Sequence, residues 1–314
     1  MVLTLICIVI VVVFLISIIF IPHKMGEKLA HPGGRDPEVC FQEKVNLGII
    51  DVQQYEKAQK EDFIFKSANG YELKGVYILR KKEFAELKNH KVIILVHGFT
   101  SNHFDMLPYY DMFYRNGFDC VIYDHRNHGY SEKNYTTMGL EESKDLEGIY
   151  KIVKEKFGED SQIGLLGESM GAASVMLASS NLKDLSFAIE DCGYTSAWEE
   201  MLFVGKHDYH LFRIPYGDLT RKYLIKHYGY DLKEIAPVNA LAKCSKALPF
   251  LFIHGDSDSF VPSKMLKINY DAKPGNKEMK YFAGSAHAKS YREHVKEYEK
   301  LVSDFLIKNK IIKN

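Results

Sequence analysis

Six short, mostly apolar runs constrain the fold of this chain more than any other feature. The runs are KVIILVHG (91–98), FDCVIYDH (118–125), QIGLLGE (162–168), LSFAIED (185–191), LPFLFIHG (248–255) and EMKYFAG (278–284). Continuous apolar runs of this length are typical of strands buried on both faces of a parallel sheet. The segments with helical character that separate or follow them are 106–116, 140–156, 170–180, 264–271 and 291–308. This alternation predicts an α/β domain with a doubly wound, mostly parallel sheet.

Two segments depart from the alternation. Residues 62–79 alternate on both sides of Asn69-Gly70, which predicts an antiparallel β-hairpin at the start of the sheet, because both turn positions tolerate positive φ. Residues from about 197 to 238 contain no convincing strand and are rich in aromatic and basic side chains. We expect them to form an inserted helical cap over one edge of the sheet. An ordinary pair of packing helices is the alternative.

The first 21 residues contain no charged side chain. About 20 apolar residues, at about 1.5 Å rise each, cross a hydrocarbon layer of about 30 Å. A cleaved signal peptide would have a shorter apolar region, a basic start and a small-x-small exit, and none of these is evident. We therefore predict a transmembrane anchor over 1–21, a linker and helical lead-in over 22–60, and the main domain over 61–314. The positive charges of Lys24, Lys28 and Arg35 favour a cytoplasmic main domain.

The charge and cysteine content argue against nucleic-acid binding and against a disulfide-stabilised fold. Lys+Arg and Asp+Glu both number 41, so the net charge does not indicate a nucleic-acid partner. The five cysteines are scattered and odd in number, which favours buried free thiols over a disulfide framework. They are Cys7, Cys40, Cys120, Cys192 and Cys244. We predict no metal site and no cofactor.

The chemistry centres on Gly167-Glu168-Ser169-Met170-Gly171, which follows a predicted strand and opens a predicted helix. A serine held in a tight turn there projects its hydroxyl out of the sheet, and flanking glycines permit the turn. The start of the helix directs free N–H groups and a partial positive charge at the same point. This pattern indicates that Ser169 is a nucleophile; the alternative is a serine that only caps the helix.

A serine nucleophile needs a base, and His287 lies in the loop after the last predicted strand, where it could reach Ser169. The other candidate bases are His97, His125, His128 and His254. An acid should orient the imidazole, and Asp258, in the loop after the preceding strand, is our first choice over Asp191 and Asp256. The chain order Ser169, Asp258, His287 is the one expected for a nucleophile-elbow hydrolase.

An oxyanion also needs donors that are fixed before it forms. Gly98 lets the backbone turn close to the nucleophile, so that the N–H of Phe99 can point inward. The N–H of Met170, directly after the nucleophile, is the second expected donor.

Together these motifs resemble the α/β-hydrolase superfamily. They are His97-Gly98-Phe99, Asp124-x-Arg126-x-x-Gly129-x-Ser131, Gly167-x-Ser169-x-Gly171, His254-Gly255-x-x-Asp258-x-x-Val261-Pro262 and His287. The chain is similar in particular to membrane-associated serine hydrolases and esterases of the peptidase-like branch, over roughly residues 61–308. The resemblance implies an α/β-hydrolase fold, with Asp124 and Arg126 supporting the oxyanion loop and taking no part in catalysis.

The leading hypothesis is a membrane-tethered serine carboxylesterase or lipase-like hydrolase that works through an acyl-enzyme on a small-molecule or lipid-like acyl ester. The same residues would serve a peptidase, a thioesterase or an acyltransferase. A non-catalytic scaffold of this fold usually lacks the serine, the acid or the histidine, and all three are present here.

Overall fold

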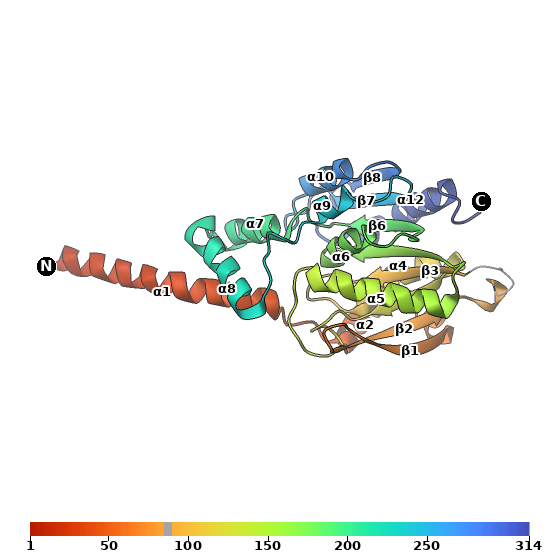
Figure 1. Cartoon of the computed structure of the whole chain (residues 1–314), viewed down its shortest axis with the longest axis horizontal. Helices are drawn as coiled ribbons and strands as arrows, with labels where there is room; N and C mark the ends of the chain where they lie inside the picture. Colours follow the sequence, from red (N-terminus) through yellow and green to blue (C-terminus); the bar gives the residue numbers. More distant parts are fainter. Residues whose placement is uncertain (85–89, 314) are drawn as a thin grey trace.

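The computed structural model describes residues 1–84 and 90–313, and at its centre is one eight-stranded sheet (Figure 1). The strands are β1 (Gln59–Lys66), β2 (Glu72–Leu79), β3 (Lys91–Val96), β4 (Asp119–Tyr123), β5 (Gln162–Glu168), β6 (Phe187–Asp191), β7 (Phe250–Gly255) and β8 (Lys277–Phe282). Their order across the sheet is β1-β2-β4-β3-β5-β6-β7-β8. Both pairings of β2 are antiparallel, and all the other pairings are parallel.

Helices cover both faces of the sheet. The helices of the two layers and the short segments that join them are α2 (Pro37–Asn46), α3 (Val52–Lys57), η1 (Lys82–Phe84), η2 (His103–Met106), α4 (Leu107–Arg115), α5 (Leu140–Phe157), α6 (Met170–Ser179), α9 (Pro237–Leu241), α10 (Lys264–Ala272), α11 (Ser290–Glu293) and α12 (Val295–Lys308). Along β3, Ile93 and Leu95 pack in the core under α4 and α12. Val92 and Ile94 pack in the core under α5 and α6. Both faces are therefore buried, which is why the central strands are continuously apolar.

The predicted elements agree closely with the observed ones. All six apolar runs form strands, β3 to β8, and the segment before them forms the β1–β2 hairpin. The hairpin connection is five residues long, and only Gly70 of the Asn69-Gly70 pair adopts a positive φ, of 88°. A longer connection needs only one left-handed residue, so the sequence placed the turn correctly but not its type.

The cap was expected between β6 and β7, and there three helical segments precede α9. They are α7 (Ala197–Tyr209), the single turn η3 (Arg213–Gly217) and α8 (Asp218–Tyr228). Trp198, Met201 and Leu224 form part of a separate apolar core beneath them. The predicted fold class, a mostly parallel sheet with an N-terminal hairpin and an inserted helical cap, is confirmed.

The N-terminal helix is longer than the predicted anchor. Helix α1 (Val2–Ala30) continues nine residues beyond Ile21 and through Pro22, and it projects from the rest of the molecule with α8 alongside its C-terminal part (Figure 1). Its apolar window has a mean hydropathy of 3.5 and is not buried, so the helix is long and apolar enough to cross a membrane. The continuation past the apolar run reflects packing: Gly26 and Ala30 are buried, and the ring of Tyr223 lies directly over Gly26.

Candidate active site

Ser169 occupies a strained turn between β5 and α6. Its φ of 57° and ψ of −116° lie outside the usual regions for a residue with a side chain. The turn leaves no room for larger neighbours: a Cβ at Gly171 would be 2.0 Å from the carbonyl oxygen of Val96, and one at Gly167 would be 2.3 Å from that of Gly171. The two glycines therefore allow the backbone to pass close to β3 and hold Ser169 at the carboxyl edge of the sheet.

A chain of hydrogen bonds joins Ser169 to two other predicted residues. The Nε2 atom of His287 is 2.9 Å from the Oγ atom of Ser169, and its Nδ1 atom is 2.7 Å from the Oδ2 atom of Asp258. His287 lies in the loop after β8 and Asp258 in the loop after β7. The structure thus brings together three side chains that are up to 118 positions apart in the sequence.

The surroundings of Asp258 keep it ionised and fixed. Burial alone would raise the pKa of its carboxyl, but hydrogen bonds from His254 and His287 outweigh burial and hold this pKa well below its usual range. Its Oδ1 atom accepts hydrogen bonds of 2.9 Å from the backbone N–H groups of Phe260 and Val261. An anionic Asp258 requires a proton on Nδ1 of His287, which leaves Nε2 free to accept the proton of Ser169.

The competing acids lie elsewhere. The Oδ2 atom of Asp191 accepts hydrogen bonds from the hydroxyls of Tyr109, at 3.3 Å, and Tyr298, at 3.0 Å. Asp256 accepts one from the backbone N–H of Gly284 at 2.7 Å, so it holds the loop after β8. Among the described residues, neither carboxylate is hydrogen-bonded to His287.

The competing histidines have structural contacts. His97 is buried, accepts a hydrogen bond at Nε2 from the backbone N–H of His125, and bonds through Nδ1 to the carbonyl of Gly98. Burial lowers the pKa of His97 to about 4, so the ring is neutral. The Nδ1 atom of His128 contacts the carbonyl of Arg126.

Asp124 and Arg126 differ in what they support. Asp124 accepts hydrogen bonds from the backbone and the ring of His103, just beyond the expected oxyanion loop. Arg126 instead contacts Asp145 of α5, 3.1 Å away, and lies over the ring of Tyr71. The side-chain contacts of Arg126 are therefore with α5 and Tyr71, and not with the expected oxyanion loop.

Phe99 and Met170, the expected oxyanion donors, line the same cavity as Ser169. Met170 is the first residue of α6, so its N–H has no partner within the helix. A Cβ at Gly98 would be 3.2 Å from the Cβ of Ser169, which shows how closely the loop after β3 approaches the serine.

One cluster of the described residues could in principle hold a metal ion. The ligand atoms of Cys192, Asp258 and His287 lie within 4.8 Å of one another. However, the ring nitrogens of His287 already contact Ser169 and Asp258, and burial raises the pKa of the Cys192 thiol well above its normal value. Because both ring nitrogens of His287 are occupied by these contacts, the cluster fits a hydrogen-bonded triad better than a metal centre.

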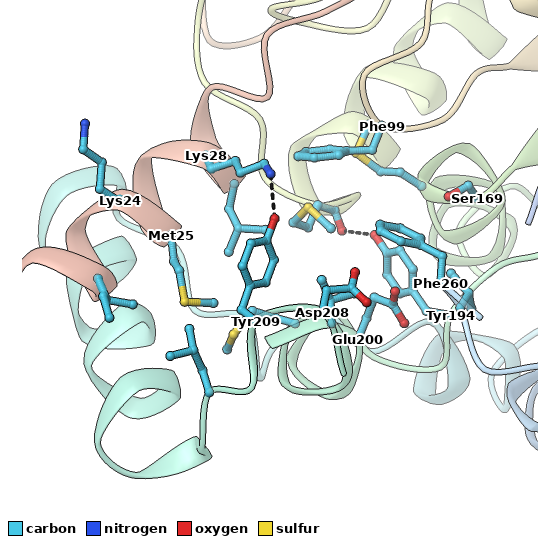
Figure 2. Close-up of a pocket in the computed structure, with 18 of the residues that line it drawn as sticks. Lys24, Met25, Lys28, Phe99, Ser169, Tyr194, Glu200, Asp208, Tyr209 and Phe260 are labelled. Atoms are coloured by element: carbon cyan, nitrogen blue, oxygen red, sulfur yellow. Dashed lines mark hydrogen bonds between the residues drawn. The ribbon is translucent and has the colours of Figure 1, made fainter. Parts of the chain in front are cut away.

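A mostly apolar cavity of about 400 Å³ extends from Ser169 to helix α1 (Figure 2). One wall comes from α7 and the loop after it, including Met201, Val204 and Leu211. Another comes from α1, including Met25 and Leu29. The α1 residues were missed by the sequence analysis. Their signal is a four-residue apolar spacing, Ile21-Met25-Leu29, that continues past the predicted end of the anchor.

Glu200 of α7 is a second residue that the sequence analysis missed. It lines the cavity, is 3% exposed, and neither carboxyl oxygen has a hydrogen-bond partner among the described residues. Burial, followed by the charges of Asp258 and Asp208, raises its pKa to about 9. Glu200 is therefore protonated at neutral pH and can donate a hydrogen bond into the cavity.

The protonation of Glu200 predicts a pH-dependent stability. Between about pH 4.5 and pH 9, Glu200 is protonated in the folded chain and ionised in the unfolded chain. The contribution of this proton to the free energy of unfolding is therefore complete below pH 4.5 and is lost as the pH rises to about 9. Gln cannot ionise. The Tm of Glu200→Gln minus that of the wild type is therefore expected to increase by several degrees between pH 5 and pH 8.5 in thermal melts. Glu199→Gln, at the exposed neighbouring position, is the control and should show no such trend. A Glu200→Gln difference independent of pH would contradict the assignment.

The comparisons with known proteins agree with this architecture. The model of the family described as "Serine aminopeptidase, S33" matches residues 88–188. The chain is 30% identical over 297 residues to the uncharacterized protein YqkD of Bacillus subtilis, covering 94% of this chain and 91% of that protein. It is 26% identical over 204 residues to the uncharacterized membrane protein YNL320W of Saccharomyces cerevisiae, covering 64% and 66%. The esterase Pf2001 of Pyrococcus furiosus has a similar structure, with a TM-score of 0.64 and 22% identity, covering 84% of this chain and 93% of the esterase. This likeness shows the fold alone.

Proposed function

Because this chain is a member of the α/β-hydrolase superfamily, we propose that it is a serine hydrolase that cleaves carboxylic esters through an acyl-enzyme intermediate. The observation that carries the proposal is the unbroken chain of hydrogen bonds from Ser169 through His287 to Asp258. In this proposal Ser169 is the nucleophile, His287 the general base and Asp258 the acid that orients the imidazole.

In the proposed reaction, each step uses groups around Ser169. His287 accepts the Ser169 proton at Nε2 while Oγ bonds to the ester carbonyl carbon. The carbonyl oxygen becomes an oxyanion and accepts hydrogen bonds from the N–H groups of Phe99 and Met170, each contributing about 3–4 kcal/mol. The protonated His287 then gives its proton to the leaving alcohol. Water then gives a proton to His287 as its oxygen bonds to the acyl carbon. The bond from Oγ to that carbon breaks, His287 returns the proton to Ser169, and the acid is released.

The lining of the cavity supports an ester over a peptide. A peptide brings amide N–H and C=O groups that need partners when buried, whereas the wall formed by residues such as Met25, Met201 and Leu211 is apolar. The peptidase alternative is favoured by one observation, the match of residues 88–188 to a family of serine aminopeptidases. A thioesterase or acyltransferase would use the same residues.

Turnover of a substrate panel tests the proposal. The purified full-length protein is expected to hydrolyse p-nitrophenyl esters, to react covalently with a fluorophosphonate probe, and to leave aminoacyl p-nitroanilides intact. Turnover of the anilides without turnover of any ester would replace the esterase by a peptidase.

We also propose that α1 anchors the enzyme as a single-pass membrane protein with the hydrolase domain in the cytoplasm. Support comes from the unburied apolar helix, from the Lys24, Lys28 and Arg35 charges that follow it, and from the membrane-protein relative. A membrane-impermeant fluorophosphonate should then label the protein only after the cells are lysed. Labelling in intact cells would reverse the orientation.

A further inference from the structure

The last turns of α1 have two different faces. Pro22, Gly26 and Ala30, four residues apart, are buried, and the ring of Tyr223 on α8 lies against Gly26. Ile21, Met25 and Leu29 are each offset from these by one residue and line the Ser169 cavity. The helix that enters the membrane is thus also one wall of the proposed active site.

Polar contacts fix the cap to this helix. The carboxylate of Glu27 accepts hydrogen bonds from the hydroxyls of Tyr223, at 2.7 Å, and Tyr228, at 2.6 Å. The amine of Lys28 donates to the hydroxyl of Tyr209 at 2.8 Å, as drawn in Figure 2. The cap and α1 therefore form one body around the cavity.

The register of these contacts sets the depth of the cap relative to the membrane. The hydroxyl of Ser17 is 2.8 Å from that of Tyr216 in η3. Ser17 lies four residues before the end of the uncharged run at Ile21, which is about 6 Å along a helix. Four and two residues before Tyr216, Phe212 is 71% exposed and Ile214 is 74% exposed. The tip of the cap (residues 209–216) thus carries unpaired apolar side chains at the level of the hydrocarbon boundary.

The cavity has an apolar interior, and its charged lining residues face solvent. The lining of the cavity between Ser169 and Met25 is mostly apolar, and Glu200 is a buried acidic residue in it. The charged lining residues Lys24, Lys28 and Asp208 are exposed. Figure 2 shows Lys24 and Met25 on the opposite side of the cavity from Ser169. An acyl chain whose ester lies at Ser169 would therefore extend through the apolar part of the cavity toward Met25 on α1.

We propose that the cavity receives the acyl chain of a single-chain, membrane-resident lipid ester, which reaches Ser169 directly from the bilayer between α1 and the tip of the cap. This inference rests on the proposed ester hydrolysis and assigns its substrate class. The volume of about 400 Å³ is near the lower end of the range of about 300–1,000 Å³ for small-molecule sites, which suits one chain.

Reaction rates of Ser169 with ethyl and dodecyl fluorophosphonates test whether the cavity binds an acyl chain. They are measured on the full-length protein, reconstituted in phosphatidylcholine vesicles. The dodecyl probe should react at least tenfold faster than the ethyl probe. Met25→Trp fills the cavity from α1 and should lower the ratio of the dodecyl rate to the ethyl rate at least tenfold, with a circular-dichroism melt to report folding. Val204→Trp, on the opposite wall, should act in the same way. Ile16→Trp, on the exposed part of α1, is the matched control and should change neither rate.

If Met25→Trp and Val204→Trp lower both reaction rates equally, or change neither rate, the cavity does not bind the acyl chain and the proposal is wrong. Failure of the proposed function looks different: neither probe labels Ser169. If the probes label Ser169 but no ester is hydrolysed, the proposed ester hydrolysis is wrong. The two probe rates would still show whether the cavity prefers the longer chain.

The position of the cap is tested without catalysis. In a Trp198→Phe background, the fluorescence of Phe212→Trp should be quenched by vesicles of acyl-chain-brominated phosphatidylcholine and protected from acrylamide. Met279→Trp, on β8, should show the reverse. Acrylamide quenching of the tryptophan at 212 without lipid quenching would place the cap in water and overturn delivery from the bilayer.

Discussion

Replacing Ser169 with alanine is expected to lower kcat for ester hydrolysis by about 10⁵- to 10⁶-fold and to abolish fluorophosphonate labelling. The methyl group of alanine can form no acyl-enzyme, so water would have to attack the ester without a covalent step. The backbone donors of Phe99 and Met170 would remain and leave a small residual rate. Initial rates on a p-nitrophenyl ester, measured together with a circular-dichroism melt, check this result.

Two further variants make the Ser169 result specific. Ser179→Ala alters another buried serine of α6, whose hydroxyl bonds to the carbonyl of Val175, and should keep wild-type activity. Adding His287→Ala to Ser169→Ala should cost almost nothing more, because the two side chains act as one unit. A large additional loss would show that His287 acts on a different nucleophile.

Replacing Asp258 with asparagine is expected to lower kcat by about 10⁴-fold with little change in KM. The amide is uncharged, so it cannot stabilise the imidazolium that forms when His287 takes the proton. It also offers N–H groups toward Nδ1, which favours the tautomer of His287 with its proton on Nε2. That tautomer cannot accept a proton from Ser169. Steady-state kinetics over a range of pH values would measure the effect.

The chain offers two matched controls for Asp258. Asp256→Asn changes a carboxylate two residues away that holds Gly284, and Asp191→Asn changes one that is bound by Tyr109 and Tyr298. Both should retain activity within about tenfold, in line with a cost to stability alone. A loss of 10⁴-fold in either, with Asp258→Asn active, would move the acid to that position.

The choice among these acids shows where inference from sequence ends. Asp191 and Asp258 both lie at or just after the carboxyl ends of neighbouring parallel strands, β6 and β7, so strand prediction places both near Ser169. The loop after β7 decides between them, because the N–H groups of Phe260 and Val261 turn the carboxylate of Asp258 toward His287. The catalytic roles themselves remain predictions that the two substitutions test.

The sequence by itself determined what depends on near neighbours. Apolar runs of strand length specified β3 to β8, the glycines around Ser169 specified the sharp turn into α6, and the uncharged first 21 residues specified a helix able to cross a membrane. These features follow from local periodicity and backbone sterics, which a linear sequence displays directly.

Only the tertiary structure decided how far α1 extends and what it does. Helix α1 continues to Ala30 because Tyr223 and Tyr228 of α8, about 200 residues later, pack on Gly26 and bind Glu27. The same docking brings Met25 and Leu29 into the cavity of Ser169. Such contacts join residues far apart in the chain, and their free energy comes from surfaces that form only when the cap and the helix meet.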